Sequence, residues 1–143
     1  MENTKFQFKG FIVKRSVIEL KDGETGKKFN ISINPYGKLI PPQSLFELIL
    51  EVQVFDENKI LNIELLVSAD FYFDKKVEKT RLNNLFFVNA PAILFPYVRA
   101  YISTLTNLSG IKPINLPTLN LTQLADQLRE NTKEVAEGSI KNK

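Results

Sequence analysis

The residue types that most often carry covalent or metal chemistry are missing from this 143-residue chain, which has no cysteine and no histidine. Disulfides, thiol nucleophiles, Cys/His zinc sites and Ser–His or Cys–His catalytic pairs are therefore excluded. The adjacent carboxylates Asp56 and Glu57 lie in a short polar segment, where nothing would raise a carboxyl pKa for acid–base catalysis. The six glycines form no phosphate-binding string, and no EF-hand pattern occurs. The sequence predicts a non-enzyme without cofactor or metal, and a small enzyme or a metal site built on acidic residues stays the alternative.

Apolar surface is the chemistry that the chain does offer. Hydrophobic residues make up 43% of the sequence and charged residues 24%, values typical of a globular protein. There are 11 Phe and 4 Tyr but no Trp, and Phe86 and Phe87 are adjacent. A single domain of this length buries roughly two-thirds of its unfolded surface, so a full core is expected.

The charge distribution argues against a nucleic-acid partner. Net charge is +3 and the isoelectric point is about 9.1. The basic residues, however, occur as isolated pairs such as Lys14-Arg15, Lys27-Lys28 and Lys75-Lys76. Binding of a phosphate backbone needs several basic groups on one face. A mixed-sign, solvated surface is therefore predicted.

The sequence shows no signal for secretion or membrane insertion. The first five residues have no apolar segment typical of a secretory signal, and no run of about 18 apolar residues occurs. We therefore expect no membrane insertion. Together with the absence of cysteine, this predicts a cytoplasmic protein.

The first half of the sequence reads as strands. Alternation begins at Phe6 and changes phase at Gly10, which predicts a β-bulge there. The expected faces beyond the bulge are Phe11, Val13 and Val17 on one side and Ile12, Ile18 and Leu20 on the other. A second half-buried strand is predicted over 29–34, followed by a stiff, irregular connection through the prolines of 35–42.

Two further strands, over 45–55 and 60–73, are separated by the polar segment 56–59 and should form a hairpin. One face of each is consistently apolar, and the other is mixed. This is the pattern of an antiparallel sheet with helices on one side.

The second half changes to helical spacing. Asn89 and Pro91 predict the start of a long helix, which Ser109-Gly110 would end. The apolar, proline-containing stretch 111–119 is predicted to be an irregular connection. Asn120 and Gln123 have the spacing of a capping box for a short helix to about residue 130, and 131–143 is predicted to be a flexible polar tail.

The string Ile93 to Arg99, Ile-Leu-Phe-Pro-Tyr-Val-Arg, resembles the start of the long helix in the SecB family of protein-export chaperones. The glycine that closes the helix, the connection from Pro113 to Leu121, the short Leu-rich helix and the preceding strands agree in order. The motif covers about 89–128, and the wider pattern covers nearly the whole chain.

The resemblance implies an α+β fold, in which a four-stranded antiparallel sheet carries a long helix and a short C-terminal helix on one face. Residues 1–130 would form this single domain. It also implies a homotetramer, a dimer of dimers, that holds unfolded precursor polypeptides without ATP and delivers them to the SecA translocase ATPase. Because this chain is basic whereas familiar SecB proteins are acidic, a SecB-like chaperone dedicated to one client, such as an antitoxin, is the alternative.

Three groups of residues are candidates for these roles. The client-binding candidates are Phe71, Phe73, Phe86, Phe87, Ile111, Pro113, Ile114, Leu116 and Leu119, for each of which packing in the core is the alternative. The helix-borne candidates for the oligomer interface are Ile93, Tyr97, Tyr101, Leu105 and Leu108. The resemblance places docking of SecA at the acidic residues Glu64 and Glu51.

Basic residues are expected to play a secondary role. Lys14, Arg15, Lys27 and Lys28 are candidates to flank the groove and attract acidic clients, with plain solubility as the alternative. Arg99 is a candidate to pair across the oligomer interface, or it is simply solvated.

Overall fold

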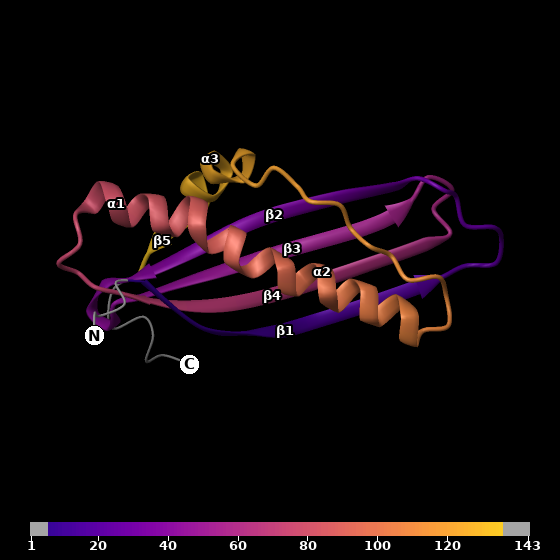
Figure 1. The fold of residues 1–143 in the computed structure, drawn as a ribbon, viewed down its shortest axis with the longest axis horizontal. Helices are drawn as coiled ribbons and strands as arrows, with labels where there is room; N and C mark the ends of the chain where they lie inside the picture. Colours follow the sequence, from indigo (N-terminus) through magenta and orange to yellow (C-terminus); the bar gives the residue numbers. More distant parts are fainter. Residues whose placement is uncertain (1–5, 136–143) are drawn as a thin grey trace.

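Long alternating stretches of sequence become long strands in the computed structural model, which describes residues 6–135 (Figure 1). The strands are β1 (Phe6–Leu20), β2 (Phe29–Ile40), β3 (Leu45–Asp56), β4 (Leu61–Phe73) and a short β5 (Thr132–Glu134). Their order across the sheet is β1-β4-β3-β2-β5, antiparallel throughout apart from β5, which pairs parallel to β2. The predicted fold class is confirmed, with five strands in place of four.

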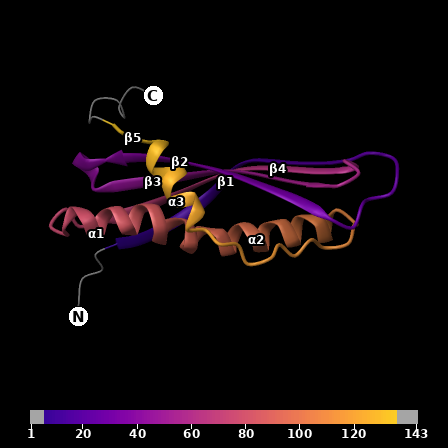
Figure 2. The same ribbon diagram turned by 90° about the horizontal axis from the view of Figure 1, so that it is seen from above.

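The helices lie on one side of this sheet (Figure 2). Helix α1 (Lys79–Asn84), a wide turn η2 (Leu85–Asn89) and α2 (Ala90–Leu108) form one continuous rod. Helix α2 crosses the strands obliquely, and a connection then runs back over the sheet to α3 (Gln123–Glu130) (Figure 1).

Strand β1 contains two irregularities. The expected bulge at Gly10 is confirmed, since the pairing with β4 shifts between Phe8 and Phe11. A second shift lies between Val13 and Arg15. The predicted faces are confirmed for Phe11, Ile12 and Val13. Because the extra residue at the second shift reverses the alternation of faces, they were wrong after it. Ile18 is opposite Ile63 and lies on the helix side together with Val13, whereas Val17 is opposite Glu64 on the other side.

Strand β2 continues through the predicted irregular connection, to Ile40. It tolerates Pro35 because the missing N–H of that residue lies on the edge of the strand that faces away from β3. On this edge, the carbonyl oxygen of Pro35 accepts from Asn131 Nδ2 at 3.1 Å, and Gly37 N donates to the carbonyl of Asn131 at 3.3 Å. Proline is accepted where no ladder bond is lost. The turn to β3 is a single 3-10 turn at Pro41–Gln43.

The predicted hairpin between β3 and β4 is confirmed, and Asp56 closes it. The side chain of Asp56 is fully buried. Its carboxylate accepts from the backbone N–H groups of Ile60 and Leu61, at 2.8 and 2.7 Å, and from those of Gly26 and Asn58. Burial alone would raise the pKa of Asp56, but these four donors outweigh it and lower the pKa below its ordinary value.

The long helix begins ten residues before its predicted start. Asn89 has helical backbone angles and makes no capping bond, so it is not the cap. Instead, the N–H of Ala90 donates to the carbonyl of Leu85, one residue further back than in an α-helix. This wider turn comes directly before Pro91, which has no N–H to continue the regular pattern.

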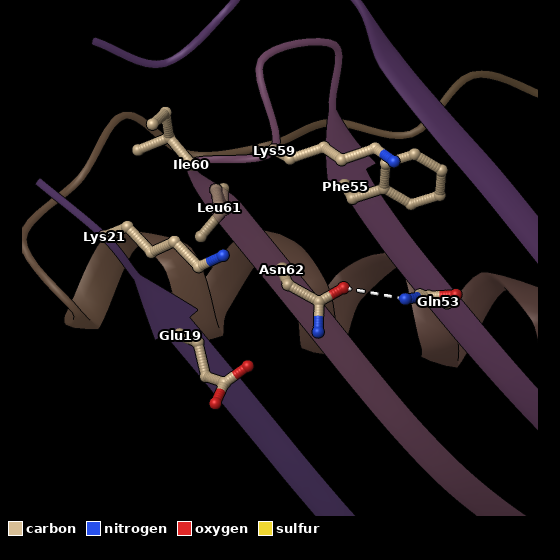
Figure 3. Close-up of a pocket in the computed structure, with 8 residues that line it drawn as sticks. All are labelled: Glu19, Lys21, Gln53, Phe55, Lys59, Ile60, Leu61 and Asn62. Carbon is tan, nitrogen blue, oxygen red and sulfur yellow. Dashed lines mark hydrogen bonds between the residues drawn. The ribbon is translucent and has the colours of Figure 1, made fainter. Parts of the chain in front are cut away.

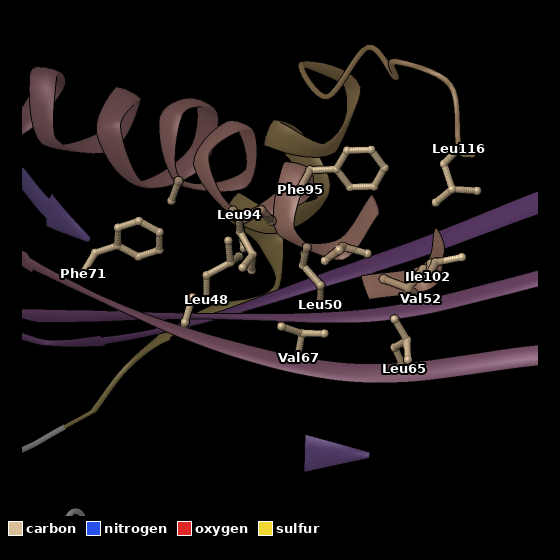
Figure 4. Close-up of a cluster of buried hydrophobic side chains, with 14 of the residues drawn as sticks. Leu48, Leu50, Val52, Leu65, Val67, Phe71, Leu94, Phe95, Ile102 and Leu116 are labelled. Carbon is tan, nitrogen blue, oxygen red and sulfur yellow. The ribbon is translucent and has the colours of Figure 1, made fainter. Parts of the chain in front are cut away.

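The core forms between the apolar face of the strands and the inner face of the helices (Figure 4). The strands contribute every second residue, as expected, namely Phe46 to Val54 in β3 and Leu61 to Phe73 in β4. Leu94, Phe95 and Ile102 of α2 lie above them. Each large side chain buried there stabilises the fold by about 1.5–3 kcal/mol.

The rod Lys79–Leu108 is long and apolar enough to span a bilayer by length and composition alone. In this fold its buried residues pack on the sheet instead. The hydropathy of the rod is therefore that of a core helix lying over a sheet.

Two details at the C-terminal end correct the sequence analysis. Asn120 does not form a capping box, since its Oδ1 accepts from the N–H of Thr122, two residues away. The predicted tail begins too early, because Thr132–Glu134 form β5. Residues 136–143 of that tail lie outside the described residues.

We expect Asp56→Ala to lower the free energy of unfolding by about 2–4 kcal/mol, because four backbone donors lose a charged acceptor. Chemical denaturation measures the loss. Asp22→Ala, an exposed carboxylate in the neighbouring turn, is the matched control and should change stability little.

The loss should depend on pH. Because the folded state lowers the pKa of Asp56, its stabilisation is complete above the unfolded pKa, about 3.9, and disappears as pH falls through the lower folded value. The difference in the free energy of unfolding between wild type and Asp56→Ala should become smaller below about pH 4. A difference that stays constant to lower pH would contradict the assignment of this stabilisation to the Asp56 carboxylate.

Candidate functional site

The apolar connection that follows α2 lies alongside the helix because three helix side chains hold it. Arg99 Nε donates to the carbonyl of Leu116 at 3.2 Å, and Ser103 Oγ donates to Asn115 Oδ1 at 3.1 Å. The N–H of Ile114 donates to Thr106 Oγ1 at 2.9 Å. These residues lie about one turn apart on α2 and so form one row. Arg99, a candidate either for pairing across an oligomer interface or for solvation, thus makes a contact within the chain, and its pairing across an interface stays a prediction.

Thr106 is the buried anchor of this row. Its hydroxyl donates to the carbonyl of Ile102 at 2.8 Å while it accepts from Ile114. The side chain is fully buried, so both bonds are shielded from water. A buried N–H without a partner is costly, and this hydroxyl therefore fixes where the connection crosses the helix.

A hollow of about 590 Å³ opens between the start of the connection and the turn that precedes β2. Its apolar lining is Phe29, Leu61, Ile111, Pro113 and Ile114. The remaining lining residues are Thr25, Gly26, Lys27, Lys112 and Asn115. The volume lies within the range of pockets that take small molecules or a few side chains.

The turn on the far side of the hollow is held by the hairpin. Gly26 N donates to Asp56 Oδ2 at 2.8 Å, and Lys27 N donates to Glu57 Oε2 at 3.0 Å. The two acidic residues of the hairpin thus position a wall of the hollow.

The hollow offers apolar contact and positive charge. Its lining contains no carboxylate, and the described residues contain no cluster of three acidic side chains placed to hold a metal ion. Apolar contact is non-directional and depends on area, so such a surface accepts many sequences. Lys27 and Lys112 would favour an occupant with acidic residues near its apolar ones.

The four aromatic client-binding candidates do not reach this hollow. Phe71, Phe73, Phe86 and Phe87 are buried in the core. Phe86 stacks on Phe46 with ring centroids 4.6 Å apart and meets Phe73 at 5.0 Å. The helix rod begins early enough to bring Phe86 and Phe87 down onto the sheet, so the core interpretation holds for all four.

The candidates from the connection divide into two groups. Ile114 and Leu116 are buried against the helix and sheet, so they form the base of the connection. Ile111 and Leu119 are half-buried and Pro113 is exposed. Of these five residues, Ile111, Pro113 and Ile114 line the hollow.

Phe29 and Leu61 were missed as site residues by the sequence analysis. Phe29 keeps 36% of its surface exposed at the mouth of the hollow. Its position directly after Lys27-Lys28, at the start of an alternating strand, was an available signal. Leu61 had no such signal, because it looks like any other residue on the apolar face of β4.

A second exposed apolar surface lies where α2 passes over β1. Tyr97 contacts Phe8 and Phe11, with ring centroids 5.6 and 5.1 Å apart, and remains 44% exposed. Leu108 is 79% exposed. The other interface candidates, Ile93, Tyr101 and Leu105, are half-buried. We call Phe11, Tyr97 and Leu108 the α2–β1 seam.

The docking candidates Glu64 and Glu51 lie on the opposite face of the sheet. Arg15 Nη1 donates to Glu64 Oε1 at 2.8 Å, and this bond, with a second from Asn62, lowers the pKa of Glu64. Glu51 accepts from the hydroxyl of Tyr36 at 3.2 Å and its charge raises the pKa of that tyrosine. Both carboxylates are therefore partnered within the subunit.

The end of this same face carries a polar hollow of about 410 Å³ (Figure 3). Gln53 and Asn62 are joined there at 2.8 Å, next to Lys21, Lys59 and Glu19. The charges of this hollow are of both signs, since Glu19 lies beside Lys21 and Lys59.

Two of the predicted groove-flanking cations are on this outer face. Arg15 pairs with Glu64, and Lys14 Nζ lies 3.9 Å from Glu47. Both are thus excluded from the groove, because the sheet separates them from it. Of the four predicted cations, Lys27 lines the hollow.

Comparison with known proteins gives a consistent result. A family model described as preprotein translocase subunit SecB matches residues 19–132. The protein-export protein SecB of Anaplasma phagocytophilum is 25% identical over 125 residues, covering 76% of this chain and 78% of its own. An uncharacterised protein of Methanocaldococcus jannaschii is 27% identical over 140 residues, covering 92% and 89%.

Among solved structures, a SecB-like chaperone of Mycobacterium tuberculosis, in complex with a peptide of the HigA1 antitoxin, has a TM-score of 0.69. It shares 15% identity, and the match covers 81% of this chain and 88% of that one. This likeness concerns the fold.

We expect Thr106→Val to loosen the connection, because the buried N–H of Ile114 would lose its acceptor at nearly constant side-chain volume. The free energy of unfolding should fall by about 1–3 kcal/mol. Hydrogen exchange at the Ile114 amide should accelerate more than exchange in the sheet.

Thr104→Val, an exposed threonine on the same helix, is the matched control. Equal exchange at Ile114 in both variants would show that Thr106 does not anchor the connection.

Proposed function

The chain belongs to the SecB family of chaperones, which are not enzymes, and we propose that it is an ATP-independent holdase for unfolded precursor polypeptides. The observation that carries this proposal is the open, apolar hollow rimmed by Lys27 and Lys112. This hollow can contact an unfolded segment through apolar side chains without requiring a particular sequence. Holding by apolar contact draws on buried area alone, so we expect it to proceed without nucleotide.

Client binding would use the residues that the hollow leaves accessible. Phe29, Ile111 and Pro113 would contact apolar client side chains, while Leu61 and Ile114 form the floor. An extended client exposes alternate side chains on one face every two residues. A stretch with several large apolar residues and a nearby carboxylate would thus be preferred.

The exposed α2–β1 seam supports the proposal of a homotetramer. Tyr97 and Leu108 expose large apolar surfaces at a helix that one sheet does not cover completely. A second copy would bury them. An assembly would also place several hollows within reach of one long client, which raises the effective affinity.

From the family resemblance we also propose that the chain is cytoplasmic and that it docks the SecA translocase ATPase. Glu51 and Glu64 lie on the flat outer face, as such docking requires, but Arg15 neutralises part of that charge. Delivery to SecA would therefore require Arg15 to exchange partners.

A chaperone dedicated to one client, such as an antitoxin, is the second candidate. It is favoured by the basic net charge of +3 and by the likeness in fold to the mycobacterial chaperone in complex with an antitoxin peptide. The two functions differ in breadth of binding rather than in the surface used.

The holdase proposal predicts suppression of the aggregation of an unfolded client at stoichiometric ratio without ATP, measured by light scattering. Phe29→Gln with Ile111→Gln should weaken client binding at least about tenfold, since a large apolar contact contributes about 1.5–3 kcal/mol when fully buried.

Ile12→Gln with Tyr72→Gln is the matched control, because both residues are exposed and apolar on the opposite face of the sheet. Equal holding by the two double variants would reject the hollow as the client site. Failure of the wild type to hold any client would reject the holdase.

Breadth of binding separates the two candidates. Titration of several unrelated unfolded proteins should give dissociation constants within about tenfold of each other for a general holdase, because apolar contact discriminates weakly. One client bound at least about a hundredfold more tightly than the rest would establish the dedicated function instead.

A further inference from the structure

Strand β5 occupies part of a sheet edge that would otherwise be open. It pairs parallel to Gly37–Leu39 of β2. Its bonds to β2 include Gly37 N to the carbonyl of Asn131 at 3.3 Å and Val135 N to the carbonyl of Leu39 at 2.8 Å. An edge covered in this way is closed to any other strand.

The backbone groups along this edge form two parts, one on each side of Pro35. Every second residue of β2 points its N–H and C=O away from β3, and Gly37 and Leu39 belong to this set. By the same alternation, so do Phe29, Ile31 and Ile33, beside which the described residues place no strand. Pro35 lies between the two parts and has no N–H to offer.

This edge leads away from the client hollow. Phe29 lines the hollow and is the first residue of β2. A client seated in the hollow and extended along the edge would pass Ile31 and Ile33 and then meet the side chain of Asn131 at Pro35 and β5 at Gly37. From Phe29 to Leu39 the path is 11 residues, or about 36 Å at 3.3 Å per residue.

The short length and exposed side chains of β5 make it a removable occupant. It is three residues long, and its Lys133 and Glu134 are exposed, so little apolar surface holds it in place. Gly37 lets it approach, because a Cβ at that position would collide with Thr132 Oγ1. A segment held mainly by a few backbone bonds lies at the low end of local stability.

We propose that β5 is a built-in competitor of the client, which closes the distal half of the β2 edge in the empty chaperone and is displaced by a long extended client. This rests on the proposed function, since it assumes that unfolded polypeptides are the ligand. For a long client, the apparent affinity is the intrinsic affinity multiplied by the fraction of molecules in which β5 is undocked. Short clients that bind only in the hollow do not compete with β5.

A reversible cross-link tests the competition. Lys38 and Lys133 are directly opposite in the register of β2 and β5, and the native chain has no cysteine. Lys38→Cys with Lys133→Cys, once oxidised, would lock β5 in place, and a reductant would release it in the same sample.

The probe is a fluorescent, cysteine-free peptide of about 20 residues with alternating Leu and Ser and a Glu at each end, long enough to run along the whole edge. We expect the oxidised form to bind it at least about fivefold more weakly than the reduced form. A peptide of about six residues, which does not reach Gly37, should bind both forms equally.

A pair of proline variants gives an independent measurement. Val135→Pro removes the N–H that donates to Leu39, whereas the N–H of Glu134 points away from β2 and Glu134→Pro should leave the pairing intact. Val135→Pro should tighten binding of the long peptide about fivefold, the factor for one backbone hydrogen bond of about 1 kcal/mol. Glu134→Pro should match the wild type.

The outcomes separate this inference from the proposed function. If the wild type binds the long peptide but oxidation and Val135→Pro leave its affinity unchanged, the competitor role is overturned and the holdase stands. If the wild type binds neither the long nor the short peptide, the holdase falls and the competitor role falls with it.

Discussion

Coverage of one apolar sheet face by one long helix, with only the short helices α1 and α3 beside it, is the constraint on which the rest of this molecule depends. Strands lie about 4.8 Å apart and a helix with its side chains is about 10 Å wide, so one helix cannot cover every strand. Helix α2 lies obliquely over the sheet and seals its centre through Leu94, Phe95 and Ile102. The uncovered flanks become the α2–β1 seam on one side and the space under the connection on the other.

Buried polar side chains decide the shape of the second flank. Thr106 holds the connection at Ile114, and Asp56 holds the facing turn at Gly26. Neither residue touches a client in our proposal, yet the hollow opens between the two segments that they fix. The hydrogen bonds of Thr106 and Asp56 thus position the two segments, and the apolar residues between them would contact the client. Such a division suits a site with a fixed shape that accepts many client sequences.

The two faces and the edge of the sheet have different chemistry. The helix face supplies apolar surface with lysines at its rim, and the outer face carries carboxylates partnered by Arg15 and Tyr36. The β2 edge offers backbone groups and is partly filled by β5. The proposed client holding, partner docking and control of access would thus use separate parts of one small domain.

The sequence by itself determined the strands, the hairpin, the class of the fold and the family, because period-two alternation and the Ile93–Arg99 string are local signals. Tertiary structure alone decided the second bulge of β1, the passage of β2 through Pro35 and the start of the helix at Lys79. It also decided which apolar residues stay accessible. The exposure of Phe29 and Phe86 depends on what packs above each, a contact between segments distant in the chain.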